Sequence, residues 1–372
     1  MSVPLLDLRR DWPEIREEVE AGWRKVTESM RLLNGENLRA FEEEVARFFG
    51  ARFAFGVGSG TAALWLALIA CGIGPGDEVL IQANGFVADV EAVVWAGARP
   101  VLVEAEEEFF GPDPAAVERA IGPRTKALIV VHMYGHPAHI GELSEICRRH
   151  GLVLIEDASH AHGAEYRGRK VGTFGKVGCF SCGPVKNLNA LGDAGFVLTD
   201  DEEVAHRLRY LRVHGQVRKN EHEFYGFNSR LDELQAVVLR ARLRRLSEKN
   251  ARRREIAEIY RRELSGLPDL RLPPGDGADR VSVYHRFVIF TPRRNELQAY
   301  LKERGIGTGI YYPVPLHLQP AWRAAGFPEL PRGTFPVAER LCGEGLALPM
   351  FPEMTEAEIR EVIAAVREFF GV

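Results

Sequence analysis

The apolar runs KALIVV (126–131), LVLIE (152–156) and KVGCFS (176–181) decide the fold class of this chain. Each run is short and continuous rather than alternating, which is the pattern of a strand buried on both faces of a parallel sheet. Four further runs of the same kind lie at 53–57, 78–81, 99–103 and 195–199. Because helical patterns separate them, the sequence predicts an α/β fold in which a mostly parallel seven-stranded sheet lies between helices.

The composition changes after a long helical pattern. An Arg- and Glu-rich stretch over 229–264 is followed by residues 266–280, which are dense in Pro, Gly and Asp and indicate a passage between domains. We predict a large domain at 14–245 and a small C-terminal α/β domain at 246–372 that includes residues 1–13. The elements expected after the passage are a strand at 283–290, a helix at 295–304, a Pro-rich loop at 311–320 and a closing helix at 355–370.

Charge and cysteine usage exclude several classes of protein. The 372 residues carry 48 basic and 52 acidic side chains, a net charge of -4, so we expect no nucleic-acid partner. No segment is long and apolar enough for a membrane span, and the N-terminus lacks a secretory signal, so we expect a cytoplasmic location and no membrane partner. Cys179 and Cys182 form a CxxC pair, but no second pair follows at zinc spacing, so we predict no metal site.

Lys186 differs from the other seven lysines of the chain, which lie in charged, loop-like or strand-start contexts. It follows the third run in a turn, GPVKN (183–187), at the carboxyl end of a predicted strand, where parallel sheets place their ligands. Desolvation there would lower its pKa and favour the neutral amine that attacks carbonyl groups. A solvated surface lysine is the competing interpretation.

Two further features accompany this lysine. Asp157 follows the run 152–156 at another strand end, where a carboxylate needs a cationic partner such as the ring nitrogen of pyridoxal phosphate. The turn GVGSGT (56–61) leads from a strand into a helix, and its free amides favour a phosphate. Its spacing is neither the GxGxxG of a dinucleotide site nor a P-loop. The competing interpretations are a helix cap or salt bridge for Asp157 and a plain tight turn for 56–61.

Together with motifs along nearly the whole chain, these features give a resemblance to a known family. The sequence resembles the DegT/DnrJ/StrS family of pyridoxal-phosphate-dependent sugar aminotransferases, which have the type I aminotransferase fold. The motifs that carry the resemblance are VPLLDL (3–8), GDEV (76–79), YGHP (134–137), EDA (156–158), GDAG (192–195), NSRL (228–231), YPVPLH (312–317) and LP (348–349).

The resemblance implies roles for the residues around the cofactor ring. Lys186 matches the lysine that binds the cofactor covalently and moves the proton between the amino acid and the cofactor. Asp157 matches the carboxylate paired with the pyridine nitrogen, and Phe86 matches the aromatic residue stacked on the ring. A Phe in the core of a helix is the alternative for Phe86.

The resemblance also implies a phosphate site and an assembly. Gly60, Thr61 and Ser181 match phosphate ligands within one chain. Asn228 matches an asparagine that reaches the phosphate of the neighbouring subunit, which implies a homodimer with shared active sites.

Three positions depart from the family pattern. Gly85 replaces a common Thr before the stacking aromatic residue, which removes a hydroxyl and would widen the pocket. His160 replaces a common Gln; it can still bond the ring oxygen of the cofactor, but a histidine titrates near neutrality, and a capping or core histidine is the alternative. Gly183 replaces an aromatic residue or His before Pro184, so a side chain that shapes the pocket is missing.

Candidate substrate residues come from two regions. His317 and Tyr311 or Tyr312 lie in the loop that by resemblance approaches the acceptor, although packed aromatics in a Pro-stiffened loop explain them equally well. Arg230 suits a bidentate anion, either a donor carboxylate or a sugar nucleotide, and a surface salt bridge is its alternative.

The resemblance implies a ping-pong transfer of an amino group from L-glutamate or L-glutamine to a keto group of a nucleotide-linked deoxysugar. The turn NLNALGD (187–193) looks closer to members that act on 3-keto sugars. The alternatives are a glutamine-dependent aminotransferase of a keto-inositol (scyllo-inosose) and a non-catalytic regulatory protein of the same fold.

Overall fold

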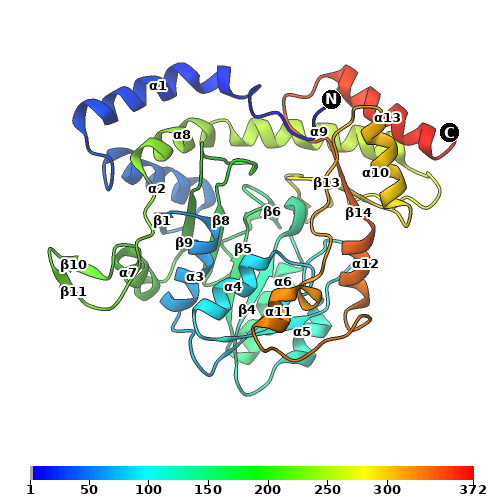
Figure 1. The fold of residues 1–372 in the computed structure, drawn as a ribbon. Coiled ribbons are helices and arrows are strands. Elements are labelled where there is room, and N and C mark those ends of the chain that lie inside the picture. The colour runs from blue at the N-terminus through cyan, green and yellow to red at the C-terminus, as the bar shows by residue number, and fades with distance from the viewer. Residues whose placement is uncertain (1–2) are drawn as a thin grey trace.

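The computed structural model describes residues 3–372, and a seven-stranded sheet lies at its centre (Figure 1). The strand order is β1-β9-β8-β5-β4-β2-β3; β9 runs antiparallel to both neighbours and the other adjacent pairs are parallel. The strands are β1 (Phe53–Val57), β2 (Glu78–Gln82), β3 (Arg99–Val103), β4 (Thr125–Val131), β5 (Val153–Asp157), β8 (Val177–Ser181) and β9 (Gly195–Thr199). All seven predicted strands are present, each within one residue at either end, and the α/β class is confirmed.

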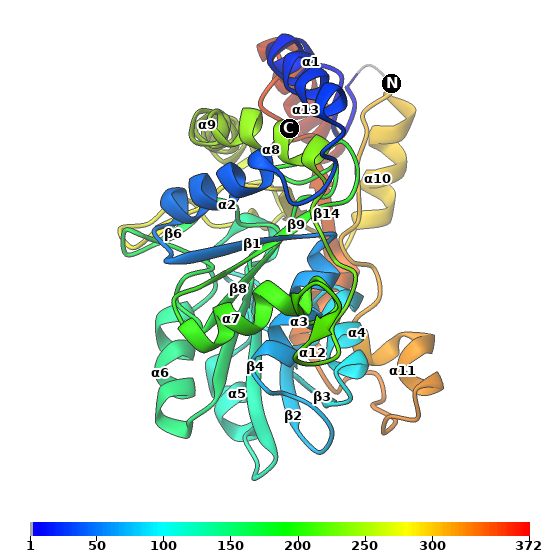
Figure 2. The ribbon, with the colours of Figure 1, turned by 90° about the vertical axis from the view of Figure 1, so that its left-hand side faces the viewer.

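Two apolar clusters cover the two faces of this sheet. Successive residues of one strand alternate between them: Leu80 belongs to one cluster and Ile81 to the other. This is why the strands read as continuous apolar runs. Helices α3 (Gly60–Ala70), α4 (Val87–Trp95) and α7 (Glu202–Leu211) contribute to one cluster, and α2 (Glu36–Phe49), α5 (Pro114–Ala120), α6 (Ile140–His150) and α8 (Glu233–Leu243) contribute to the other (Figure 2).

The helical pattern over 229–264 is interrupted in the structure. Helix α8 ends at Leu243 and α9 (Leu246–Leu264) begins after two linking arginines. The two helices bury their apolar sides in different places: Leu239 packs in a cluster on the sheet, whereas Tyr260 packs in a third cluster with the C-terminal elements. A single straight helix would not place both side chains in their clusters. Helix α1 (Trp12–Ser29) packs on α8.

The C-terminal part forms the third cluster, which also contains Val3. The expected strand at 283–290 is shorter than predicted, because 282–286 leave the sheet pattern between β12 and β13. The remaining elements are β6 (Glu165–Tyr166), β7 (Arg169–Lys170), β10 (Gln216–Arg218), β11 (Glu221–His222), β12 (Arg280–Val281), β13 (Phe287–Phe290), β14 (Gly345–Leu348), α10 (Arg294–Glu303), α11 (Pro320–Ala324), α12 (Pro336–Glu344), α13 (Glu356–Phe369) and the 3₁₀ turns η1 (Met133–Gly135) and η2 (Leu316–Leu318). The domain division at 245/246 stays a prediction.

Candidate active site

The predicted site residues converge at the carboxyl ends of the parallel strands. Strands β5 and β8 are parallel neighbours, with Asp157 opposite Cys179. Asp157 therefore lies at the same edge of the sheet as the end of β8. From that end the chain leads to Lys186 through a turn, which is closed by a hydrogen bond from the Lys186 N–H to the Gly183 carbonyl (3.0 Å). The Asp157 Oδ1 accepts a hydrogen bond from the Ser159 N–H at 2.9 Å, which fixes the orientation of the carboxylate.

Lys186 is largely withdrawn from water in this edge. Burial lowers the pKa of its amine to about 8, against the opposing effect of the Asp157 charge; the nearby Arg286 charge lowers the pKa further. A lysine with this pKa has an appreciable neutral fraction near neutral pH and can act as a nucleophile toward a carbonyl group. The solvated-surface interpretation of Lys186 does not describe this environment.

A second carboxyl group, on Asp89, lies near enough to Asp157 for the two to influence each other electrostatically. Asp89 lies in the first turn of α4 and is fully buried, and neither side-chain oxygen has a side-chain donor among residues 3–372. Burial raises the pKa of Asp89 well above its ordinary value, and the charge of the neighbouring Asp157 raises it further. A Cβ at Gly85 would stand 3.1 Å from the Asp89 Oδ2, so the glycine leaves room for this carboxyl group. Sequence reasoning missed Asp89; its only signal was an acidic residue in an otherwise apolar helix start.

The start of α3 and the end of β8 approach each other closely and form a cradle. A Cβ at Gly60 would lie 2.4 Å from the Ser181 Cβ, so only glycine permits this approach. The Ser59 Oγ caps the Ala62 N–H at 3.1 Å, while the N–H groups of Gly60 and Thr61 belong to the first helical turn and have no intrahelical acceptor. Gly60, Thr61 and Ser181 therefore lie together around a helix N-terminus of the kind that binds phosphate.

His160 is buried next to this edge and stacks on His285, with ring centroids 4.5 Å apart. Its Nδ1 has no partner among the described residues. Burial, assisted by the positive charge of Lys186, lowers the pKa of His160 well below 6.5. The expectation that His160 titrates near neutrality is therefore wrong: the ring is neutral at physiological pH, and its free nitrogen suits a neutral hydrogen bond.

Aromatic side chains form a wall beside the carboxyl pair. Phe86 precedes α4, is 45% exposed and contacts Tyr312 with the rings tilted by 33° and their centroids 4.9 Å apart, so it is not a core residue of a helix. The Tyr134 hydroxyl donates a hydrogen bond to the Tyr311 carbonyl. Burial raises the pKa of Tyr312, with the charges of Asp157 and Asp89 adding to the effect, which places this ring near both carboxyl groups.

The other predicted residues lie around this centre. Arg230 is partly exposed beside the turn that contains Gly58, and Asn228 is exposed. His317 is buried, and its Nε2 lies 3.1 Å from the Glu339 Oε1, so its ring is held against helix α12. The substrate roles of Arg230 and His317 stay predictions.

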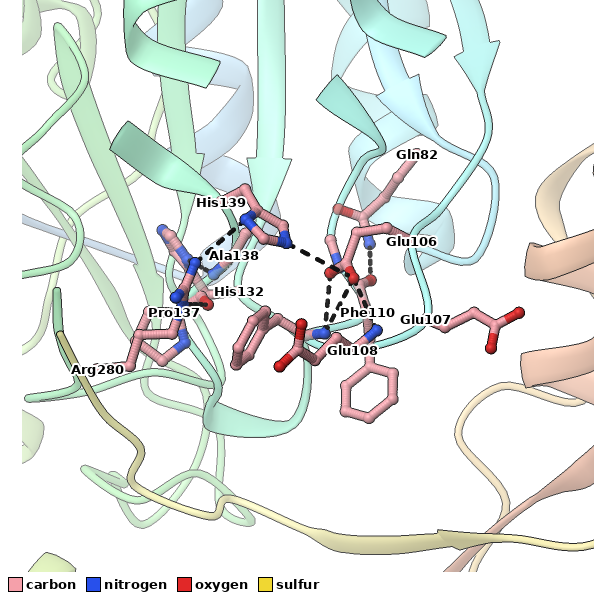
Figure 3. Close-up of polar contacts among 12 residues, drawn as sticks. Gln82, Glu106, Glu107, Glu108, Phe110, His132, Pro137, Ala138, His139 and Arg280 are labelled. Carbon is pink, nitrogen blue, oxygen red and sulfur yellow. Dashed lines mark hydrogen bonds and ion pairs between the residues drawn. The ribbon is translucent and has the colours of Figure 1, made fainter. Parts of the chain in front are cut away.

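A separate polar network supports the loops next to the site (Figure 3). His139 lies between the Arg280 guanidinium, 3.2 Å from its Nδ1, and the Glu106 carboxylate, 3.8 Å from its Nε2. The Gln82 amide donates to the Phe110 carbonyl at 2.9 Å and accepts from the Val131 N–H at 3.1 Å. The network is structural. Across residues 3–372 no group of three His, Cys, Asp or Glu side chains is arranged to hold a metal, and no helix is long and apolar enough to cross a membrane.

Comparison with known proteins identifies the family. Residues 13–367 match the model of the DegT/DnrJ/EryC1/StrS aminotransferase family. The chain belongs to this family. It is 47% identical over 367 residues to a dTDP-3-amino-3,4,6-trideoxy-α-D-glucose transaminase of Streptomyces venezuelae, covering 99% of this chain and 96% of the relative. It is 42% identical over 371 residues to a "pleiotropic regulatory protein" of Geobacillus stearothermophilus, covering 100% and 99%.

A solved structure agrees with this assignment. The crystal structure of S. venezuelae DesV in complex with a ketimine intermediate matches with a TM-score of 0.96 and 47% sequence identity, over 100% of this chain and 99% of that one. The family predicted from the motifs is confirmed, as is the type I aminotransferase fold. The protein is a pyridoxal-phosphate-dependent aminotransferase.

The residues of this aminotransferase fit its cofactor. The cradle at Gly60 and Ser181 has room only for glycine at position 60 and offers free N–H groups to a phosphate. Lys186 supplies an amine, Asp157 a buried carboxylate and His160 an unpartnered ring nitrogen. When bound, pyridoxal phosphate supplies an electron sink whose strength depends on a protonated ring nitrogen, for which Asp157 is suited.

The depressed pKa of Lys186 predicts how the apo-aminotransferase captures its cofactor. Only the neutral amine attacks, so the rate should rise about tenfold per pH unit up to its pKa of about 8 and then level off. Stopped-flow absorbance after mixing apo-protein with pyridoxal phosphate measures this rate. Free N-acetyl-lysine is the control, since its rate should keep rising to about pH 10. A protein profile that follows the control would contradict the assigned environment of Lys186.

The buried carboxyl pair predicts a gain in stability for Asp89→Asn. The pKa of Asp89 is higher in the folded than in the unfolded protein, where it is about 4. The Asp89 side chain therefore destabilises the fold increasingly as the pH rises from about 4 toward the folded-state pKa. An amide cannot ionise and keeps the shape. We expect the melting temperature of apo-Asp89→Asn at pH 7.5 to exceed that of the unmodified protein by a few degrees, a gain on the order of 1–3 kcal/mol. The gain should shrink near pH 5; an equal gain at both pH values would exclude ionisation as its cause.

Proposed function

We propose that this aminotransferase moves the amino group of L-glutamate or L-glutamine to the 3-keto group of a nucleotide-linked deoxysugar, in two half-reactions. The observation that carries the amino-transfer chemistry is the buried Lys186 amine at the same sheet edge as Asp157. The sugar and the ring position are supported by the 47% identical transaminase, whose name specifies a 3-amino sugar linked to dTDP.

In this proposal the residues of the chain have distinct tasks. Lys186 holds the cofactor, is displaced when the donor nitrogen takes its place, and then carries the proton from the donor α carbon. Asp157 holds the proton on the cofactor ring nitrogen. Phe86 and Tyr312 shield one side of the site from water, and Gly60, Thr61 and Ser181 anchor the phosphate.

We also propose a homodimer with shared active sites. The hairpin of β10 and β11 projects from the body of the molecule (Figure 1), and the following Tyr225 is fully exposed. Asn228 lies exposed just beyond it, next to Ser229, whose Oγ accepts from the Gly58 N–H at 3.1 Å. An exposed aromatic side chain on a projecting segment favours burial against a second subunit. A cytoplasmic location stays a prediction.

The test is a transfer assay on the holoprotein. Each donor is supplied separately with a dTDP-linked 3-keto-deoxysugar or with scyllo-inosose, and the aminated product is detected by mass spectrometry, with Lys186→Ala as the inactive control. We expect amination of the sugar nucleotide. Amination of scyllo-inosose alone would show that the acceptor is a keto-inositol and not a sugar nucleotide. No transfer to either acceptor from a protein with bound cofactor would overturn the proposal and favour a regulatory role like that named for the Geobacillus relative.

A further inference from the structure

Arg286 is a buried cation without an anion. It lies in the irregular segment between β12 and β13, is 2% exposed, and forms no ion pair within residues 3–372. Its Nε has no hydrogen-bond partner there, and its Nη1 reaches only the His285 carbonyl, at 3.5 Å. Its Cζ lies 5.0 Å from the centroid of the Tyr311 ring. A buried guanidinium normally has a paired anion, so the present contacts leave this one incompletely satisfied.

Arg286 lies among other charged groups, and besides burial both Asp157 and Arg286 affect the pKa of Lys186. Burial lowers the pKa of His285, and the charges of Arg286, Lys186 and Arg253 lower it further, which places these three cations around one ring. Arg253 differs from Arg286 because its Nη1 donates to two carbonyls, those of Tyr284 and Met350, at 3.3 and 3.0 Å. Arg286 therefore has weaker partners than Arg253: one carbonyl at 3.5 Å and the Tyr311 side chain, with no carboxylate paired to it.

Local structure fixes Arg286 relative to Lys186. Its backbone N–H donates to the Tyr134 carbonyl at 3.2 Å. The preceding His285 lies 3.2 Å, Nδ1 to Oδ1, from Asn187, the residue after Lys186. Two residues earlier Tyr284 has φ +41°, a conformation that non-glycine residues rarely adopt and that is often retained at functional sites. The polar pair of His285 and Arg286 also interrupts the apolar run that was expected as a strand, and this interruption is visible in the sequence.

We propose that Arg286 binds the α-carboxylate of the amino-acid donor. This inference rests on the proposed function, in which the donor nitrogen takes the place of the Lys186 amine. The α-carboxylate is one carbon away from that nitrogen, so it must lie close to the lysine that it displaces. A guanidinium offers a carboxylate two parallel N–H groups, and the unpartnered Nε is one of them. The cofactor phosphate does not compete for Arg286, because the start of α3 provides a separate binding site for it.

The test compares donors that have or lack the α-carboxylate. L-Glutamate, L-glutamine and 4-aminobutyrate, which lacks only the α-carboxylate of glutamate, are titrated against holo-Arg286→Gln and the unmodified protein. Equilibrium binding of 2-methylglutamate, which has no α hydrogen to transfer, is followed through the visible spectrum of the cofactor. We expect Arg286→Gln to weaken the binding of both L-amino acids and of 2-methylglutamate about 100-fold, which is the scale of a lost charged hydrogen-bond pair. The preference for glutamate over 4-aminobutyrate should nearly disappear.

Two controls separate this role from damage to the fold. Arg286→Lys keeps the positive charge but loses the two parallel N–H groups, so it should weaken donor binding about tenfold. The substitution Arg323→Gln, at an exposed position, should leave donor binding unchanged. Weakening of glutamate but not glutamine would assign Arg286 to the γ-carboxylate instead and overturn the proposal. Unchanged donor binding, or a loss confined to the sugar nucleotide, would overturn it as well. If the unmodified protein accepts nitrogen from neither L-amino acid, it is the proposed function that fails.

Discussion

Replacing Lys186 with alanine is expected to lower the rate of amino transfer by at least about 10⁴-fold, the upper range for removal of a group that transfers the proton. The amine is positioned at the carboxyl end of β8 and its pKa is lowered to about 8, so it serves both as the covalent anchor of the cofactor and as the base. Among the described residues Lys249 lines the same small cavity as Lys186, but its amine is paired with Glu14 and Glu353. The measurement is the single-turnover rate with L-glutamate, followed through the cofactor spectrum.

The matched control for this variant is Lys176→Ala. Lys176 precedes the same strand, is partly exposed and pairs with Asp201 at 3.2 Å, so its loss should leave the rate within about twofold. The cofactor should still bind to Lys186→Ala without a covalent bond, because the phosphate cradle at Gly60 and Ser181 is intact. Full turnover by Lys186→Ala would refute its catalytic role.

The second large effect is expected for Asp157→Asn. A neutral amide cannot hold a proton on the ring nitrogen of the cofactor, which weakens the electron sink. Removing one member of a buried charge pair costs about 3–5 kcal/mol, which corresponds to a loss of about 10²–10³-fold or more in kcat/KM. The assay is kcat/KM for the donor half-reaction together with the dissociation constant of the cofactor. Asp113→Asn, at the start of α5, is a control of the same chemistry away from the site.

The neighbouring Asp89 makes this experiment more discriminating. Because the two carboxyl groups influence each other's ionisation, either one can carry the charge that faces the ring nitrogen. If Asp157→Asn retains full activity while Asp89→Asn loses it, the roles assigned to the pair are exchanged. If only Asp157→Asn is impaired, Asp89 acts as the protonated partner that its burial predicts.

The comparison of sequence and structure is clearest at particular residues. Lys186 and Asp157 were recognisable because each follows a continuous apolar run, and the end of a buried parallel strand is a defined place in the fold. The turn 56–61 was recognisable because a glycine-rich strand-to-helix connection has few uses. By contrast, a titrating His160 was expected from its chemistry alone, and the structure reverses that expectation because His285, distant in sequence, stacks on it away from water.

The sequence by itself determined the seven strands, the family and the positions of the lysine and the carboxylate, because these depend on local hydrophobic pattern and ordered motifs. Only the tertiary structure decided which charged groups become neighbours: Asp89 beside Asp157, and Arg286, which has no ion pair among the described residues, near Lys186. Those contacts join segments about 70 to 100 residues apart, and their energetics depend on the exclusion of water by both partners. No local pattern encodes such desolvation, so the electrostatic character of this active site appears only once the chain has folded.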